Sequence, residues 1–244
     1  PFFFSCNLPV TGSWPLRLSQ LLITNNNNLL GTIMKKPTLL CSALALSLMA
    51  SFAAQAVMTK QQKEIYQVMK MDHRDEMDTK RDPNRDPIHA LPFWGFKGDM
   101  KVIEFAPGNG WYTKILAPLL KEKGELYLAY KNEWLAEMKP LLQKEVMNKA
   151  KKLPVELDWN SKEYRYELGN LDFGMTDVDM VLNIREYHNF NPEDKTKLNK
   201  AAFEALKPGG TYVIVDHTRR HMEPETRELA RREDPVQVIL EVQS

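Results

Sequence analysis

The apolar positions change their spacing sharply between residues 101 and 120. The first five residues, KVIEF, form an apolar run typical of a buried strand, and Trp111 to Leu120 carries apolar side chains at helical intervals. Ala-Pro-Gly-Asn-Gly stands between them, so the pattern predicts a strand, a tight glycine turn and a helix. Gly108 and Gly110 lack a Cβ atom, which lets a ligand approach the main chain where the first N–H groups of the helix face it.

The same spacing rules predict the other elements. We expect helices over Met58–Met71, Leu135–Lys151 with a break at Pro140, and Pro192–Leu206. We expect strands over Glu125–Tyr130, Tyr164–Leu168, Val178–Ile184 and the TYVIVDHT stretch at 211–218, which follows the turn LKPGG. Strands and helices that alternate with short turns form a doubly wound sheet, so we predict an α/β, Rossmann-like, mostly parallel sheet over residues 98–244.

A charged stretch and an aromatic stretch precede that domain. DTKRDPNRDP, from Asp78 to Pro87, mixes both signs with two prolines and could serve as a linker. The following PIHALPFWGF, from Pro87 to Phe96, is too aromatic to be left in water. We therefore expect residues 57–97 to form an N-terminal helix and a cap packed on the domain.

The first 56 residues carry signals of processing rather than of fold. Met34-Lys35-Lys36, a charge-free apolar run at 39–52 and Ala54-Gln55-Ala56 have the three parts of a secretory signal peptide, so we expect residues 34–56 to be removed. The run is shorter than the roughly 20 residues of a membrane-spanning helix, so we expect no stable membrane anchor after cleavage. Residues 1–33 contain no methionine and are interpreted as translated upstream sequence.

Charge and cysteine content narrow the function classes. The net charge of +1 gives no general basic excess, so we expect no nucleic-acid partner. Both cysteines, Cys6 and Cys41, lie in the part that we expect to be absent from the mature protein. The remaining chain has no thiol, which excludes disulfides, cysteine nucleophiles and zinc–thiolate sites there.

The glycine turn narrows the choice of nucleotide. A dinucleotide fingerprint needs a third glycine three residues after Gly110, where this chain has Thr113, and the second strand ends in Tyr130 rather than in an acid. Both features disfavour a nicotinamide oxidoreductase. The order of an acid, Glu104, and then a small-x-Gly-x-Gly turn resembles motif I of the class I S-adenosylmethionine-dependent methyltransferases.

The resemblance extends over most of the predicted domain, from Trp94 to His217. The order of the glycine turn, Gly169-Asn170, DVDMVLNI, LKPGG and a strand ending in Asp216 is that of class I methyltransferases. PGNGWYTKILAP, NIREYHN and VDHT look more narrowly like predicted bacterial methyltransferases that carry a signal peptide. That resemblance implies two further strands, the last antiparallel, so we interpret the sequence as a C-terminally truncated fragment.

The resemblance also implies a cofactor site for S-adenosyl-L-methionine. Glu104 and the backbone from Ala106 through Gly108 to Gly110 would hold its methionine part. Asn132, after the second predicted strand, would replace the usual ribose-binding acid. Asn170 and Leu171 would lie beside the adenine.

Candidate acid–base residues follow the fourth and fifth predicted strands. Open α/β folds place substrates at the carboxyl ends of strands, where this chain has Tyr187, His188, Asp216 and His217. An imidazole accepts protons near neutral pH, and a neighbouring carboxylate fixes its tautomer. We expect His188 or His217 to act as base, unless both are hydrogen-bonded structural residues, and we expect no metal.

These observations predict an exported, periplasmic methyltransferase that uses S-adenosyl-L-methionine and acts on a small-molecule substrate. S-adenosylmethionine is made in the cytoplasm, which raises an alternative for an exported protein. In that alternative the chain keeps the fold and binds a nucleoside ligand without catalysis, and the departures at Ala106 and Tyr130 favour it weakly. The sequence does not specify the methyl acceptor or the oligomeric state.

Overall fold

A computed structural model describes residues 2–7 and 58–243 of the 244-residue chain. Its contacts divide the chain into two units, Pro1–Leu16 with Gln61–Ser244, and Arg17–Lys60. The first unit contains the elements described below. The predicted signal peptide at 34–56 and residues 8–33 lie outside the described residues. Among the described helices, none combines the length and the apolar character needed to cross a membrane.

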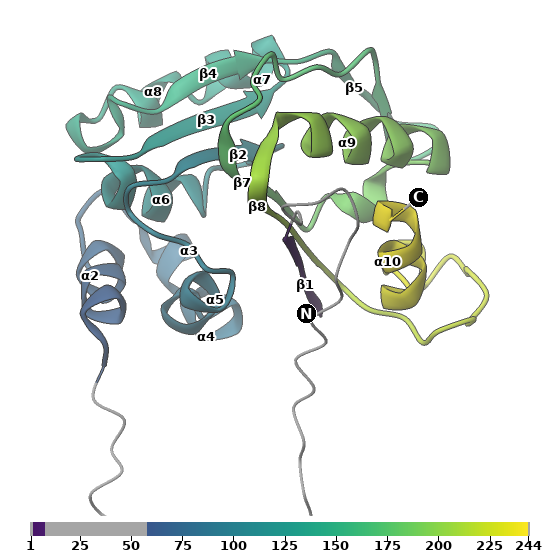
Figure 1. The fold of residues 1–244 in the computed structure, drawn as a ribbon, viewed down its shortest axis with the longest axis horizontal. Coiled ribbons are helices and arrows are strands. Elements are labelled where there is room, and N and C mark those ends of the chain that lie inside the picture. The colour runs from purple at the N-terminus through teal and green to yellow at the C-terminus, as the bar shows by residue number, and fades with distance from the viewer. Residues whose placement is uncertain (1, 8–57, 244) are drawn as a thin grey trace, which may run out of the picture. The chain divides into compact units, whose positions relative to one another are not determined.

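The described residues form a six-stranded sheet in the order β1-β8-β7-β2-β3-β4 (Figure 1). Five strands are parallel: β2 (Lys101–Phe105), β3 (Glu125–Tyr130), β4 (Lys151–Pro154), β7 (Val178–Ile184) and β8 (Leu206–Asp216). The sixth, β1 (Phe2–Asn7), is antiparallel to β8. Because the chain reverses its direction of winding at β2, the carboxyl ends of β2 and β7 mark the switch point where such sheets bind ligands.

Helices bury both faces of this sheet. Val102 belongs to one apolar cluster, with α6 (Thr113–Leu120) and the cap, and the next residue, Ile103, to the other, with α9 (Pro192–Ala205) and α10 (Pro235–Gln243). Successive strand residues point to opposite faces, and both of these are fully buried. Central parallel strands covered on both sides read as continuous apolar runs, which is why β2 and β7 were predictable.

The segment before the sheet is a folded cap of short helices. It consists of α2 (Lys60–Met69), α3 (Glu76–Thr79), α4 (Asp82–Arg85) and α5 (Pro87–Phe93). The side chain of Asp75 caps α3, and Arg74 pairs with Asp82 at 2.6 Å. The stretch that could have been a linker therefore holds its own ion pair and caps, and the aromatic stretch after it is buried at Leu91 and Trp94.

Two predicted elements differ in part from the structure, although the break expected near Pro140 is present. The helix expected over Leu135–Lys151 is broken into α7 (Asn132–Glu137), α8 (Lys139–Leu142) and the 3₁₀ turn η1 (Glu145–Met147), and the chain then enters β4. Pro140 lacks the N–H group that would bond to the Ala136 carbonyl and continue α7, and it stands instead in the first turn of α8. The strand KKLP of β4 is short and mostly exposed at the sheet edge, so it has no apolar period to detect.

The strand expected at Tyr164–Leu168 does not belong to the main sheet. Its residues form β6 (Arg165–Leu168), which pairs antiparallel with β5 (Leu157–Asn160) in a separate two-stranded sheet. The expected turn LKPGG is also different, because Leu206 already pairs with Val178 in β8 and a bulge follows before Thr211 pairs with Met180. Gly209 has φ of +81° in that bulge.

The edge strand β1 was not expected from the sequence. Its backbone pairs with β8 from Phe2 opposite Asp216 to Asn7 opposite Thr211, and the two strands lie side by side in Figure 1. The family resemblance implied an antiparallel strand from the end of the chain, whereas the described residues place one from its start next to β8. The interpretation of 1–33 as upstream sequence stays a prediction.

We predict that the cap unfolds together with the sheet. Leu91 is fully buried among sheet and α6 residues, so Leu91→Ala should lower the free energy of unfolding by about 2–5 kcal/mol through lost burial and a residual cavity. Phe93→Ala on the same helix is the control, since Phe93 is 59% exposed and should cost much less. Urea unfolding followed by circular dichroism and tryptophan fluorescence should show one shared transition, and an early separate transition of the cap would contradict this packing.

Candidate functional site

A cavity of about 720 Å³ opens at the carboxyl ends of β2 and β7. Its walls come from four parts of the chain: the cap, the glycine turn after β2, the residues after β7 and β8, and the segment at 227–232. Glu104, Ala106 and Gly108 line it together with His188 and His217. Its volume lies in the range of small-molecule and cofactor sites.

The glycine turn has left-handed backbone at three positions. Ala106, Gly108 and Gly110 have φ of +50°, +56° and +73°. A Cβ atom on Gly110 would lie 2.8 Å from the Leu141 side chain, so that glycine lets α8 pack closely. A Cβ atom on Gly108 would meet nothing within 4 Å, so Gly108 is the glycine that leaves its main chain open to the cavity.

Ala106 is the strained member of the turn. Left-handed geometry costs a residue with a Cβ atom about 1–2 kcal/mol, and Ala106 stands where the family motif that the chain resembles has a small residue. Its methyl group is buried in the apolar cluster that contains Phe105. The packing of that methyl group therefore offsets part of the backbone strain.

Glu104, the second-last residue of β2, is a buried carboxyl group on the cavity wall. It is 3% exposed, and the Thr113 hydroxyl donates a hydrogen bond of 2.6 Å to its Oε2 atom. Burial raises the pKa of Glu104 to about 8, and the hydrogen bonds from Thr113 oppose that rise. The group is thus largely protonated at neutral pH in the free protein, and an ammonium group brought against it would favour its ionised form.

His188 and Asp216 form a close pair where β7 and β8 end. The Nδ1 atom of His188 lies 2.7 Å from one oxygen of Asp216 and 2.9 Å from the other. The backbone N–H groups of His188 and His217 also donate to the Asp216 carboxylate, at 3.0 and 2.7 Å. The carboxylate fixes the proton on Nδ1, which leaves Nε2 of a cavity-lining imidazole as a proton acceptor.

His217 is placed differently. Its Nε2 atom lies 2.7 Å from Nη2 of Arg185, and because a guanidinium only donates, that ring nitrogen is the acceptor. Burial lowers the pKa of His217, and the charge of Arg185 acts in the same direction. The lone pair that a general base would need is engaged, so the geometry favours His188 over His217 as the base.

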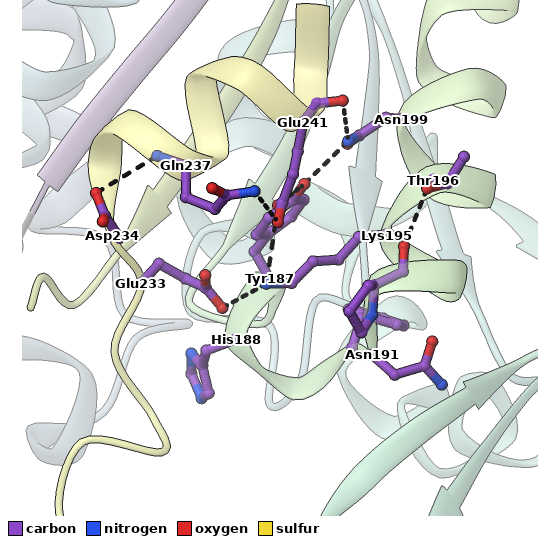
Figure 2. A network of polar contacts seen from close by, with 12 residues as sticks. Tyr187, His188, Asn191, Lys195, Thr196, Asn199, Glu233, Asp234, Gln237 and Glu241 are labelled. Carbon is purple, nitrogen blue, oxygen red and sulfur yellow. Dashed lines mark hydrogen bonds and ion pairs between the residues drawn. The ribbon is translucent and has the colours of Figure 1, made fainter. Parts of the chain in front are cut away.

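Tyr187, the fourth predicted catalytic side chain, does not line the cavity. Its hydroxyl donates to Glu241 at 3.1 Å and accepts from Asn199 at 2.9 Å, contacts that Figure 2 shows between α9 and α10. Lys195 lies 4.8 Å from the centre of the same ring and pairs with Glu233 at 2.8 Å. Tyr187 thus fastens the C-terminal helix to the domain.

The predicted ribose and adenine residues also lie apart from the cavity. Asn132 lines a second cavity of about 620 Å³ with Leu157 and Gly169, beside the two-stranded sheet. Leu171 is buried in an apolar cluster, and Asn170 is exposed without lining either cavity. The structure therefore brings together the methionine-side and acid–base residues of the prediction, and not its adenine-side residues.

Six arginines line the main cavity, and the sequence prediction included none of them. They come from the cap, from the end of β7 and from the C-terminal segment: Arg81, Arg85, Arg185, Arg227, Arg231 and Arg232. The guanidinium carbon of Arg85 lies 4.5 Å from the Trp111 ring centre, next to the glycine turn. The run RELARR at 227–232 carries three arginines and could have indicated a local basic patch, but the near-zero net charge of the whole chain gave no such indication.

No group of three potential metal ligands occurs among residues 2–7 and 58–243. His221 contacts Asp234 at 2.9 Å and does not line the cavity.

Comparison with known proteins supports the fold. No family model matches the chain, and no curated protein matches it. An O-methyltransferase family protein from Burkholderia thailandensis is similar in structure with a TM-score of 0.50 at 14% identity, over 68% of this chain and 51% of that one. A SAM-dependent methyltransferase from Aquifex aeolicus gives 0.49 at 21% identity, over 71% and 87%. Sequence identities this low show the fold alone. The fold of this chain is Rossmann-like, of the class I methyltransferase type.

We predict that the buried Glu104 carboxyl makes stability depend on pH. Its folded pKa of about 8 lies above its ordinary value of 4.5, so between these values the folded protein holds a proton that the unfolded chain has lost. The free energy of unfolding therefore falls as the pH rises through that window, by up to about 1.4 kcal/mol per unit. Glu104→Gln cannot titrate, so the stability difference between wild type and variant should change steadily from pH 5 to 8, in urea unfolding. Parallel pH curves for the two proteins would rule out the raised pKa.

We also predict that the two turn glycines differ in their cost of replacement. Gly108→Ala should lower the free energy of unfolding by about 1–2 kcal/mol, from left-handed strain alone. Gly110→Ala adds the collision with Leu141, which brings the loss to about 2–5 kcal/mol. Equal losses in urea unfolding would show that Gly110 is not held by close packing.

Proposed function

We propose that this chain is a methyltransferase that uses S-adenosyl-L-methionine and acts on a small molecule. The observation that carries the proposal is that one cavity is bordered by the open glycine turn with Glu104 on one side and by the His188–Asp216 pair on another. A binding protein would need the turn alone, whereas an oriented imidazole that faces the same cavity supplies a proton acceptor. The class I methyltransferase fold agrees with this function.

The residues present fit the methionine part of the cofactor. Gly108 leaves room at its main chain, and the Glu104 carboxyl at the cavity wall suits an amino group. Trp111 and Tyr112 complete this wall with aromatic surface, which Arg85 covers with its guanidinium. When bound, S-adenosylmethionine would supply a methyl group from a positively charged sulfur. The sulfur keeps the electron pair of the broken sulfur–carbon bond and becomes a neutral thioether.

The chain's own residues then have two tasks. The turn and the cap hold the methyl donor in line with the acceptor, because displacement at carbon depends on alignment. Nε2 of His188 takes the proton from the acceptor oxygen or nitrogen as that atom forms its bond to the methyl carbon. Asp216 stabilises the imidazolium that results, as a carboxylate on Nδ1 does in other acid–base pairs.

Export remains part of the proposal and rests on residues 34–56. The basic start, apolar run and Ala-Gln-Ala end of this stretch support cleavage after Ala56 and a periplasmic location. N-terminal sequencing of the natural protein tests it, since export predicts a mature chain that starts at Val57.

We predict that His188→Gln separates binding from transfer. Calorimetry should give the same affinity for S-adenosylhomocysteine in wild type and variant, because His188 is placed on the acceptor side. Transfer of a radioactive methyl group to acceptors in a small-molecule extract should fall by about 10²–10⁴-fold with the loss of a general base. His221→Gln is the matched control, because His221 is exposed and does not line the cavity.

Three outcomes would count against the proposal in different ways. No heat at millimolar S-adenosylmethionine or S-adenosylhomocysteine would refute cofactor binding. Tight binding without transfer would favour the non-catalytic binding protein. Full transfer activity in His188→Gln would remove general-base catalysis by this residue.

A further inference from the structure

The main cavity is lined by more cationic than carboxyl side chains. None of its six arginines forms an ion pair with a carboxylate among residues 2–7 and 58–243. The Lys114 ammonium, by contrast, is paired with Asp78 at 2.7 Å. Unpaired guanidinium groups that share one cavity repel one another, so this arrangement is costly unless an anion lies between them.

The carboxyl groups of the cavity do not offset this charge. Burial raises the pKa of Glu104 to about 8 and also raises the pKa of Glu186. Asp75 is occupied as a helix cap, where its side chain accepts from the Asp78 backbone at 2.9 Å. Glu228 is an exposed residue on the C-terminal segment, and Asp78 is already paired with Lys114, so the carboxyl groups of the cavity are fewer than its six guanidinium groups.

Arg185 is held in place at the acid–base pair. It follows β7 with φ of +65°, a strained conformation for a residue with a side chain, and its backbone N–H donates to Val215. Its Nη2 atom contacts His217, and its Nε atom is buried without a hydrogen-bond partner in the described structure. The guanidinium of Arg185 therefore has hydrogen-bonding capacity that an acceptor oxygen in the cavity would use.

The C-terminal segment brings further arginines to the same place. Nη2 of Arg231 contacts the Asn189 side chain at 3.3 Å, one residue from His188, and Nη1 of Arg232 contacts the Thr218 carbonyl at 3.2 Å. Glu233 fixes this segment, because its backbone N–H donates to the His217 carbonyl at 2.7 Å and its side chain pairs with Lys195 (Figure 2).

We propose that Arg185, Arg231 and Arg232 bind an oxyanion group, a carboxylate or a phosphate, of the methyl acceptor beside His188. A guanidinium fork matches the two oxygens of either group. The assignment of the oxyanion to the methyl acceptor rests on the proposed function, whereas the anion site itself is inferred from the arginines alone. The same cavity also faces the glycine turn, so the carboxylate of the cofactor is the second source of an oxyanion, and Arg85 lies on that side.

Titration of the full chain with inorganic phosphate and with acetate tests the site, at constant ionic strength set with chloride. Wild type should bind at least one of the two anions, and Arg185→Gln should weaken that binding about tenfold or more through loss of charge-assisted hydrogen bonds. Arg220→Gln is the matched control, because Arg220 is an exposed arginine in the loop after β8 and does not line the cavity. If Arg185→Gln fails to fold, the double variant Arg231→Gln/Arg232→Gln replaces it, since both side chains lie on exposed residues.

The affinity for S-adenosylhomocysteine distinguishes the sources. Our assignment predicts that Arg185→Gln keeps the affinity for S-adenosylhomocysteine within about twofold. It also predicts that neither phosphate nor acetate competes with S-adenosylhomocysteine. Equal anion affinity in wild type and Arg185→Gln would overturn the site. Competition, with a parallel loss of S-adenosylhomocysteine binding, would assign the arginines to the cofactor and overturn the acceptor assignment. Anion binding that depends on Arg185 without any S-adenosylhomocysteine binding would refute the proposed function and leave the anion site standing.

Discussion

The arrangement of the candidate site depends on the hydrogen bonds that the Asp216 carboxylate accepts. Asp216 stands at the end of β8 and accepts from the backbone of His188 and of His217, as well as from the His188 ring. One side chain thus joins the carboxyl ends of two neighbouring parallel strands and sets the direction of an imidazole. Buried at 1% exposure, this charge is tolerable because several donors satisfy it.

The two sides of the site obtain their precision in different ways. The glycine turn relies on backbone geometry, with left-handed residues that open Gly108 to the cavity and pack Gly110 against Leu141. The acceptor side relies on side chains from distant parts of the sequence, which the buried Lys195–Glu233 pair and the Tyr187 hydroxyl hold together. Under the proposed function, binding of the methyl donor would be a local property of β2 and α6, whereas recognition of the acceptor would depend on the docking of α10.

The sequence predicted the parts of this fold that have strong local signals. The central strands, the glycine turn, α9 and the places of His188 and Asp216 after neighbouring strands all follow from apolar runs, turn residues and strand order. It did not predict β4, whose four residues are mostly exposed, or the edge strand β1. It assigned Asn132, Asn170 and Leu171 to the ligand by motif order, and the hairpin of β5 and β6 takes the chain elsewhere. The cavity arginines were missed because the cluster forms in three dimensions, from three separate segments of the chain between Arg81 and Arg232.

A crystal structure of the protein with S-adenosylhomocysteine tests the central claim most directly. The account predicts that the amino acid part of the ligand lies against the main chain of Gly108 with its ammonium group at Glu104, and that its sulfur atom faces the side of the cavity that holds His188. A ligand bound in the second cavity beside Asn132, or bound with its sulfur away from His188, would contradict the account.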